Sequence, residues 1–161
     1  MPIRSLRAAD AVRCDEIIAA LPYFFGIDAG VQACADAVRT QRGWVAEVTG
    51  AVVGFLTVEH LINPEISWLA VHPEHRHHGL GKALISAAVD ALTSEGHTLL
   101  TVLTLGPSVV EEATDNYAGT RRFYRSAGFE AVRELDLADW EQPALLMSRQ
   151  LRSTESTVVN G

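Results

Sequence analysis

Residues 69–82 read LAVHPEHRHHGLGK, and this stretch decides the fold. Its first residues continue an apolar run, which predicts a buried strand over 66–71. Its last residues open a segment in which Leu80 and Leu84 recur at helical spacing. This spacing predicts a helix over about 79–94. The stretch therefore joins a strand to a helix through a loop that contains two glycines.

Patterns on both sides of this stretch predict the rest of a sheet. A turn at Thr49-Gly50 separates two segments of period-two hydrophobicity, so we expect a hairpin there. The run LLTVLTL at 99–105 is apolar on both faces, which is typical of a central strand. The expected strands span 2–6, 44–48, 51–58, 66–71, 98–105, 129–137 and 144–151.

Three further helices are expected. The first follows Asp10, which is its expected N-cap, and the second starts near Asp28. The third spans about 117–127 and is stopped by Gly128. The residues expected on the buried faces of the first two are Cys14, Ile17, Ile18 and Leu21, then Ile27, Val31, Cys34, Ala35 and Val38.

The element order β-α-α-β-β-β-α-β-α-β-β predicts an α/β (α+β) fold. Its core is a mixed, mostly antiparallel central sheet of about six to seven strands, flanked by about four helices. A chain of 161 residues has the size of one ordinary domain. We therefore expect a single domain over 1–152 and a polar C-terminal tail over 153–161.

Composition narrows the classes of function. A net charge of -7 disfavours a nucleic-acid partner, which calls for a basic surface, and is compatible with a cationic amine. The N-terminus lacks the apolar segment of a secretory signal, and no apolar run reaches the roughly 18 residues of a membrane span. Two cysteines form no disulfide framework. We expect a cytoplasmic protein without a membrane partner.

The loop of the opening stretch has the parts of a phosphate cradle. Gly79 and Gly81 allow the backbone to approach a ligand closely. The helix that follows begins with unpaired N–H groups and the positive end of its dipole, and Arg76 and Lys82 flank it with positive charge. A P-loop needs GxxxxGK[ST], and a dinucleotide fingerprint needs GxGxxG. Neither pattern is present.

Two motifs give the chain a resemblance to a known family. Arg76-x-x-Gly79-x-Gly81 follows an apolar strand, and Phe123-Tyr124-Arg125-Ser126-Ala127-Gly128-Phe129 lies downstream. Together with the strand and helix around them, these motifs resemble the signatures of the GNAT family of N-acetyltransferases. The resemblance covers about 44–151 and implies acetyl-CoA as co-substrate, with no metal.

The resemblance implies a set of cofactor-binding residues. Leu69, Ala70 and Val71 pair with the pantetheine arm, and an amide near Leu69 polarises the thioester carbonyl. Many family members place an asparagine seven residues before the motif tyrosine. That position is Tyr117 here, and Asn116, one residue earlier, is the nearest candidate. The backbone amides expected to bind the pyrophosphate are those of His77, His78, Gly79, Leu80, Gly81 and Lys82, with Arg76 beside them.

Two residues are candidates for the chemistry. An alkylamine is mostly protonated at pH 7, so a base must take its proton. Glu65, at the start of the strand, is the candidate base, and Glu59 is held in reserve. Tyr124 matches the tyrosine that protonates the leaving thiolate in the family. Strand alternation puts Glu65, Ser67, Leu69 and Val71 on one face if no bulge intervenes.

More than one hypothesis is open for the binding partner and for the class of activity. The main hypothesis is direct transfer to the amine of a small molecule or peptide in a ternary complex, without an acyl-cysteine. Acidic residues of the 106–116 loop would favour a cationic acceptor. The rival is a non-catalytic acyl-CoA-binding module, and a homodimer is compatible with either. The four histidines at 72–78 suggest a metal, but a stretched loop cannot easily aim them at one ion.

Overall fold

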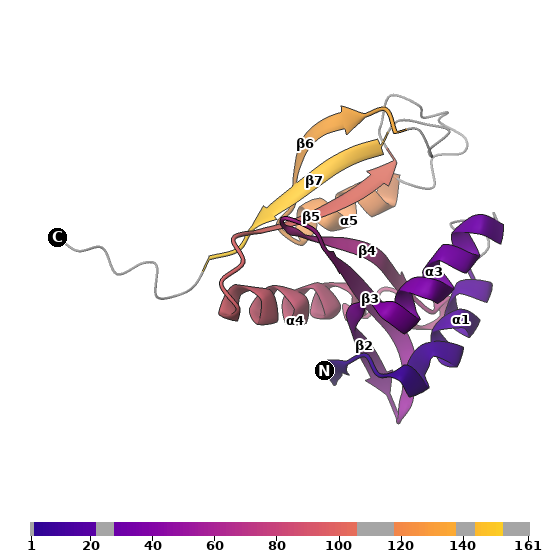
Figure 1. Ribbon diagram of the computed structural model, residues 1–161. Coiled ribbons are helices and arrows are strands. Elements are labelled where there is room, and N and C mark those ends of the chain that lie inside the picture. Colours follow the sequence, from indigo (N-terminus) through magenta and orange to yellow (C-terminus); the bar gives the residue numbers. More distant parts are fainter. Residues whose placement is uncertain (1, 22–27, 106–117, 138–143, 153–161) are drawn as a thin grey trace. The chain divides into compact units, whose positions relative to one another are not determined.

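The computed structural model describes residues 2–21, 28–105, 118–137 and 144–152 (Figure 1). The chain divides into two compact units, Met1–His60 with Ile66–Ala88 and Leu61–Glu65 with Val89–Gly161. Together they carry seven strands of one sheet. Every pairing with a stated register is antiparallel. The predicted fold class is confirmed, whereas the predicted boundary between domain and tail stays a prediction.

The first unit has strand order β1-β2-β3-β4. Its strands are β1 (Ile3–Ser5), β2 (Arg42–Val48), β3 (Ala51–His60) and β4 (Pro64–Val71), whose first two residues belong to the second unit. Its helices are α1 (Ala11–Ala19), α3 (Asp28–Thr40) and the first part of α4 (Leu80–Ser94). Short 3-10 turns, η1 (Ala8–Asp10) and η2 (Pro73–His75), precede α1 and follow β4.

Helices α1 and α3 cover one face of this unit's strands, and α4 begins on the other face (Figure 1). Val45 of β2 and Phe55 of β3 pack under α1 and α3 in one buried cluster. On the other face, Gly54 of β3 lies close to Leu84 of α4. The two faces explain why the hairpin strands are buried almost throughout.

The predicted buried faces of the two N-terminal helices are largely confirmed. Cys14, Ile17, Ile18 and Leu21 are buried as expected, and so are Cys34 and Val38. Ala35 is half-buried, and Ile27 lies outside the described residues. Val31 was placed wrongly, because it is 41% exposed and Ala37 is buried instead. Residues 31–33 are all exposed, so this part of α3 packs through residues 34–38 instead.

Asp10 occupies the N-cap position of α1 as expected, but its side chain does not cap that helix. Its backbone is helical and its side chain makes no capping bond to α1. The carboxylate instead accepts two 2.9 Å bonds from the Arg4 guanidinium and a 2.8 Å bond from the Arg7 N–H. The Arg4 bonds lower the pKa of Asp10 below its usual range. The carboxylate that the local sequence assigns to the start of α1 therefore bonds to Arg4 of β1.

The second unit has strand order β5-β7-β6. It comprises β5 (Leu99–Leu105), α5 (Ala118–Ser126), β6 (Glu130–Leu135) and β7 (Ala144–Gln150). One face of β5 is buried at Leu100, Val102 and Thr104, while Thr101 and Leu103 on the other face are only half-buried. The expectation that β5 is buried on both faces is therefore only half right. No described helix is long and apolar enough to span a membrane.

Candidate functional site

The loop between β4 and α4 is held to the hairpin by its first residues. The His72 N–H donates to the Val53 carbonyl oxygen at 2.8 Å, which extends the strand contact beyond Val71. The His72 Nδ1 atom then accepts the Glu74 N–H at 3.2 Å and begins η2. The chain leaves the sheet in a defined direction because these bonds fix its first turn.

The start of α4 supplies donors for an anion. The Ala83 N–H donates to the Gly79 carbonyl oxygen at 3.0 Å, and this bond opens the helix. The amides of Leu80, Gly81 and Lys82 therefore have no acceptor within the helix. They lie at the positive end of the helix dipole, where a phosphate is stabilised.

The backbone before α4 adopts the left-handed region twice. Gly79 has φ of 78° and His77 has φ of 64°. A Cβ atom built on Gly79 meets no atom within 4 Å, so the space in front of this residue is open. A non-glycine residue at positive φ is strained and occurs preferentially at ligand sites. The predicted pyrophosphate loop thus has the open, turned backbone that such a ligand needs.

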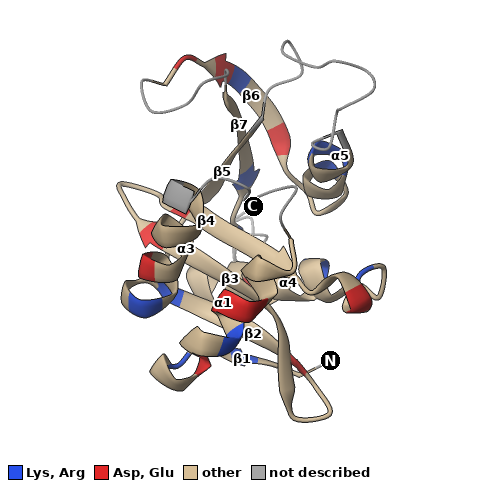
Figure 2. Cartoon of the chain, turned by 90° about the vertical axis from the view of Figure 1, so that its right-hand side faces the viewer, with Lys and Arg blue, Asp and Glu red and all other residues tan. Residues whose placement is uncertain are grey.

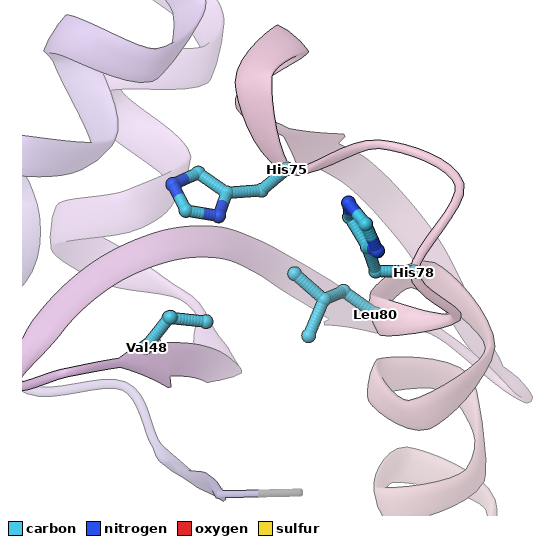
Figure 3. Close-up of a pocket in the computed structure, with 4 residues that line it drawn as sticks. All are labelled: Val48, His75, His78 and Leu80. Carbon is cyan, nitrogen blue, oxygen red and sulfur yellow. The ribbon is translucent and has the colours of Figure 1, made fainter.

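A hollow of about 320 Å³ lies beside this loop (Figure 3). Val48 and Leu80 supply apolar walls, and the imidazole rings of His75 and His78 line the same space. The volume is at the lower end of the range for small-molecule pockets. His78 and Leu80 were predicted site residues, whereas Val48 and His75 were not. Nothing in the sequence pairs the end of β2 with η2, so only the fold reveals that contact.

The side chains of β4 do not alternate regularly, which corrects the expected common face of Glu65, Ser67, Leu69 and Val71. The Ser67 hydroxyl lies 2.7 Å from the Thr57 hydroxyl and also donates to Gln41 at the end of α3. Val71 instead points to the α4 side, since both it and Leu84 flank Gly54. Residues four apart on a regular strand share a face. The strand is therefore irregular between Ser67 and Val71.

The irregular part of β4 contains the residues expected to bind the pantetheine arm. Trp68 and Ala70 pack against the cluster under α1 and α3, while Leu69 is half-buried. An irregularity of this kind re-aims side chains and interrupts the regular ladder of backbone bonds. The proposed pantetheine-binding residues thus coincide with the irregular part of β4.

Glu65 lies in the second unit and is half-buried. Its Oε1 atom accepts a 2.9 Å bond from the Thr101 hydroxyl on β5. Sequence reasoning missed Thr101, because the two residues are 36 positions apart. The reserve candidate, Glu59 at the end of β3, is exposed.

Tyr124 also lies in the second unit, on α5, and is 6% exposed. Its ring packs edge-on against Phe123 and Phe129, with centroids 5.3 Å and 5.4 Å away. Burial raises the pKa of its hydroxyl above the ordinary tyrosine value. The group is therefore protonated at neutral pH, and burial makes it a weaker acid than an exposed tyrosine.

The described residues thus supply the cradle in one unit and both candidate catalytic side chains in the other. Asn116 and the acidic 106–116 loop lie outside the described residues. Cys14 and Cys34 belong to the buried cluster, and burial raises the pKa of both thiols to about 12. Such thiols are inert as nucleophiles.

Helix α5 carries a positive face (Figure 2). Between Ala118 and Ser126 it holds three arginines and no carboxylate, and Arg122 and Arg125 are exposed. Opposite charges attract and like charges repel at such a surface. The exposed arginines of this helix therefore attract anions.

One family model matches the chain, and solved structures match its fold. Residues 39–131, more than half of the chain, match the family model of an acetyltransferase (GNAT) domain. No curated protein sequence gives a significant match. Many solved structures share the fold.

Three of these structures illustrate the range of that fold. A GNAT-family protein from Desulfovibrio desulfuricans has 22% identity and a TM-score of 0.79, over 94% of this chain and 99% of its own. An aminoglycoside 6'-N-acetyltransferase complexed with coenzyme A has 18% identity and a TM-score of 0.70, over 95% and 98%. A ribosomal-protein-alanine N-acetyltransferase from Brucella melitensis has 20% identity and a TM-score of 0.69, over 94% and 100%.

Proposed function

Because the chain belongs to the GNAT acetyltransferase family, we propose that it transfers the acetyl group of acetyl-CoA to a primary amine of a small molecule or peptide. Membership of the family makes it an acyltransferase. The co-substrate and the class of acceptor are the proposed part. The observation that carries the proposal is the turned, open loop at the start of α4.

The residues of that loop fit the pyrophosphate of acetyl-CoA. The amides of Leu80, Gly81 and Lys82 are donors without an acceptor in the helix, and open space faces Gly79. Arg76 and the exposed Lys82 add positive charge beside them. His77 and His78 complete the run of amides, and Leu69, Ala70 and Val71 are the proposed partners of the pantetheine arm. When bound, acetyl-CoA supplies an activated acyl group.

The chain's own residues then handle two protons. We assign Glu65 as the base that takes a proton from the acceptor amine, directly or through water. We assign Tyr124 as the acid that supplies a proton to the departing thiolate. A backbone N–H near Leu69 is the proposed donor to the carbonyl oxygen on which negative charge develops. Transfer is direct, because both thiols of the chain are buried and inert.

The acceptor is an amine of either of two kinds. Two structures with the same fold are named for an aminoglycoside and for the alanine of a ribosomal protein. A small polyamine or aminoglycoside and a peptide N-terminus therefore both belong in a test panel. The rival function is a non-catalytic module that binds acyl-CoA, because the same loop serves both.

The test is saturable release of coenzyme A with a panel of polyamines, aminoglycosides and peptides. We expect at least one amine to drive turnover, and Glu65→Gln to lower kcat by about a hundredfold or more, within the range of general-base effects. Glu59→Gln is the comparison variant, because it removes the same charge at the reserve candidate on the exposed end of β3. Binding of coenzyme A without turnover on any amine supports the rival. Equal losses in both variants contradict the assignment of Glu65.

A further inference from the structure

We propose that Thr101 is a positioning residue, whose hydroxyl holds the Glu65 carboxylate in the orientation that accepts the amine proton. The proposal rests on the proposed function, because it assigns Thr101 a role that acts through Glu65. It goes beyond that function by naming a residue on β5 that neither motif contains. A positioning residue touches the base and not the substrate.

The contact itself is well formed. The Thr101 Oγ1 atom donates to Glu65 Oε1 at 2.9 Å, and both side chains are half-buried within one unit. A hydrogen bond to an ionised acceptor is roughly twice as strong as one between neutral groups. Thr101 stands opposite Ser148 of β7 in a continuous antiparallel ladder, so its backbone is fixed on that side. The donor is thus mounted on a rigid strand.

The bond gives the two carboxylate oxygens of Glu65 different roles, one toward Thr101 and one toward the acceptor amine. It engages Oε1 and leaves Oε2 outside this contact. A glutamate has three side-chain torsions, and each additional orientation lowers the fraction of time spent in the reactive one. One donor to Oε1 removes most of these orientations. Oε2 is then the oxygen directed to the acceptor, and proton transfer is sensitive to such alignment.

The competing explanation is that the pair only stabilises the sheet, because cross-strand polar pairs also do so. Thr104 gives a control for the change from threonine to valine on β5. It lies on the same strand, on the opposite face, and it is 5% exposed. Its Oγ1 has no hydrogen-bond partner among the described residues. Threonine to valine at 104 therefore makes the same chemical change on β5 without touching Glu65.

The experiment compares Thr101→Val, Thr101→Ser and Thr104→Val in the full chain. Valine keeps the shape and the strand preference of threonine, and serine keeps the hydroxyl. We expect Thr101→Val to lower kcat about tenfold, with the KM for acetyl-CoA unchanged within about twofold, because the cradle is untouched. Thr101→Ser should recover kcat to within about threefold of the original, and Thr104→Val should leave kcat unaltered. If Thr101→Val folds poorly, the kcat of Thr101→Ala is compared with that of Thr101→Ser instead. This pair also differs by the presence of the hydroxyl.

A double variant shows whether Thr101 acts through Glu65. In the Glu65→Gln background, Thr101→Val should cause no further loss of kcat, since residues that act as a unit are not additive. A further tenfold loss there overturns the proposal. So does full activity of Thr101→Val beside an inactive Glu65→Gln, an outcome that leaves the proposed function intact. Full activity of Glu65→Gln itself refutes the base assignment and the positioning role together.

Discussion

Replacing Gly79 by alanine tests the cradle directly, because this residue has the clearest geometric signature in the loop. Its φ is 78°, and a built Cβ contacts nothing within 4 Å. The variant therefore meets no steric clash with the chain itself. Any loss of ligand affinity must come from the methyl group in front of the amides or from the backbone it disfavours.

The expected magnitudes follow from these two facts. An L-residue in the left-handed region costs about 1–2 kcal/mol. Alanine lowers the entropy of the unfolded chain, which returns about 0.4–1 kcal/mol. The net loss of stability is about 1 kcal/mol, or about 2–4 °C in Tm for a chain of this size. Loss of one hydrogen bond to a charged group costs about 1.5–3 kcal/mol, so coenzyme A should bind about ten- to a hundredfold more weakly.

Titration calorimetry with coenzyme A measures this loss without an acceptor amine. Gly96→Ala is the matched control, since Gly96 has φ of 90°, an equally open Cβ position and a place at the far end of α4. Both variants should lose similar stability, and only Gly79→Ala should lose affinity. An unchanged Kd for Gly79→Ala, or an equal loss of affinity in Gly96→Ala, refutes the cradle.

Two further predictions concern the buried tyrosine and the two buried cysteines. Tyr124→Phe should lower kcat tenfold or more while the KM for acetyl-CoA stays nearly constant, because the ring still packs against its two phenylalanine neighbours; unchanged steady-state kcat contradicts the assigned acid. The free energy of unfolding should fall as pH rises above about 9, because the ordinary thiol pKa is 9.0 and the folded values of Cys14 and Cys34 are about 12. Below pH 9 both states are protonated, and above it only the unfolded state loses its protons, so each thiol contributes a slope of about 1.4 kcal/mol per pH unit. Urea unfolding at pH 8 to 11 should show a shallower decline for Cys34→Ala, and an identical decline in both proteins contradicts the linkage.

Local patterns were sufficient for most of the fold. The Thr49-Gly50 turn lies between β2 and β3 as expected, and α4 begins one residue after Gly79. These features depend on residues close in sequence, so periodicity and turn chemistry report them. The loop at 76–82 was found for the same reason, because a glycine-containing turn and a helix start are contiguous.

Side-chain partners that no local pattern specifies set the features that sequence could not reveal. Asp10 binds Arg4 rather than the helix it precedes, and Thr101 finds Glu65 across 36 residues. The irregularity of β4 became visible only through the opposite neighbours of Ser67 and Val71. A pattern of apolar and polar residues fixes which side faces a core, but not which partner a polar group meets.

The burial of both thiols also determines how well a thiol-detecting assay can follow the reaction. A colorimetric disulfide reagent reacts with exposed thiolates, and both cysteines of this chain are at most 1% exposed. The folded protein should therefore give almost no signal of its own. Each equivalent of reacted reagent then corresponds to one molecule of released coenzyme A. This holds even at the high enzyme concentrations that are needed to detect turnover of a poor acceptor. Adding denaturant should expose both cysteines to the reagent. The resulting rise in absorbance, two equivalents per chain, therefore measures unfolding.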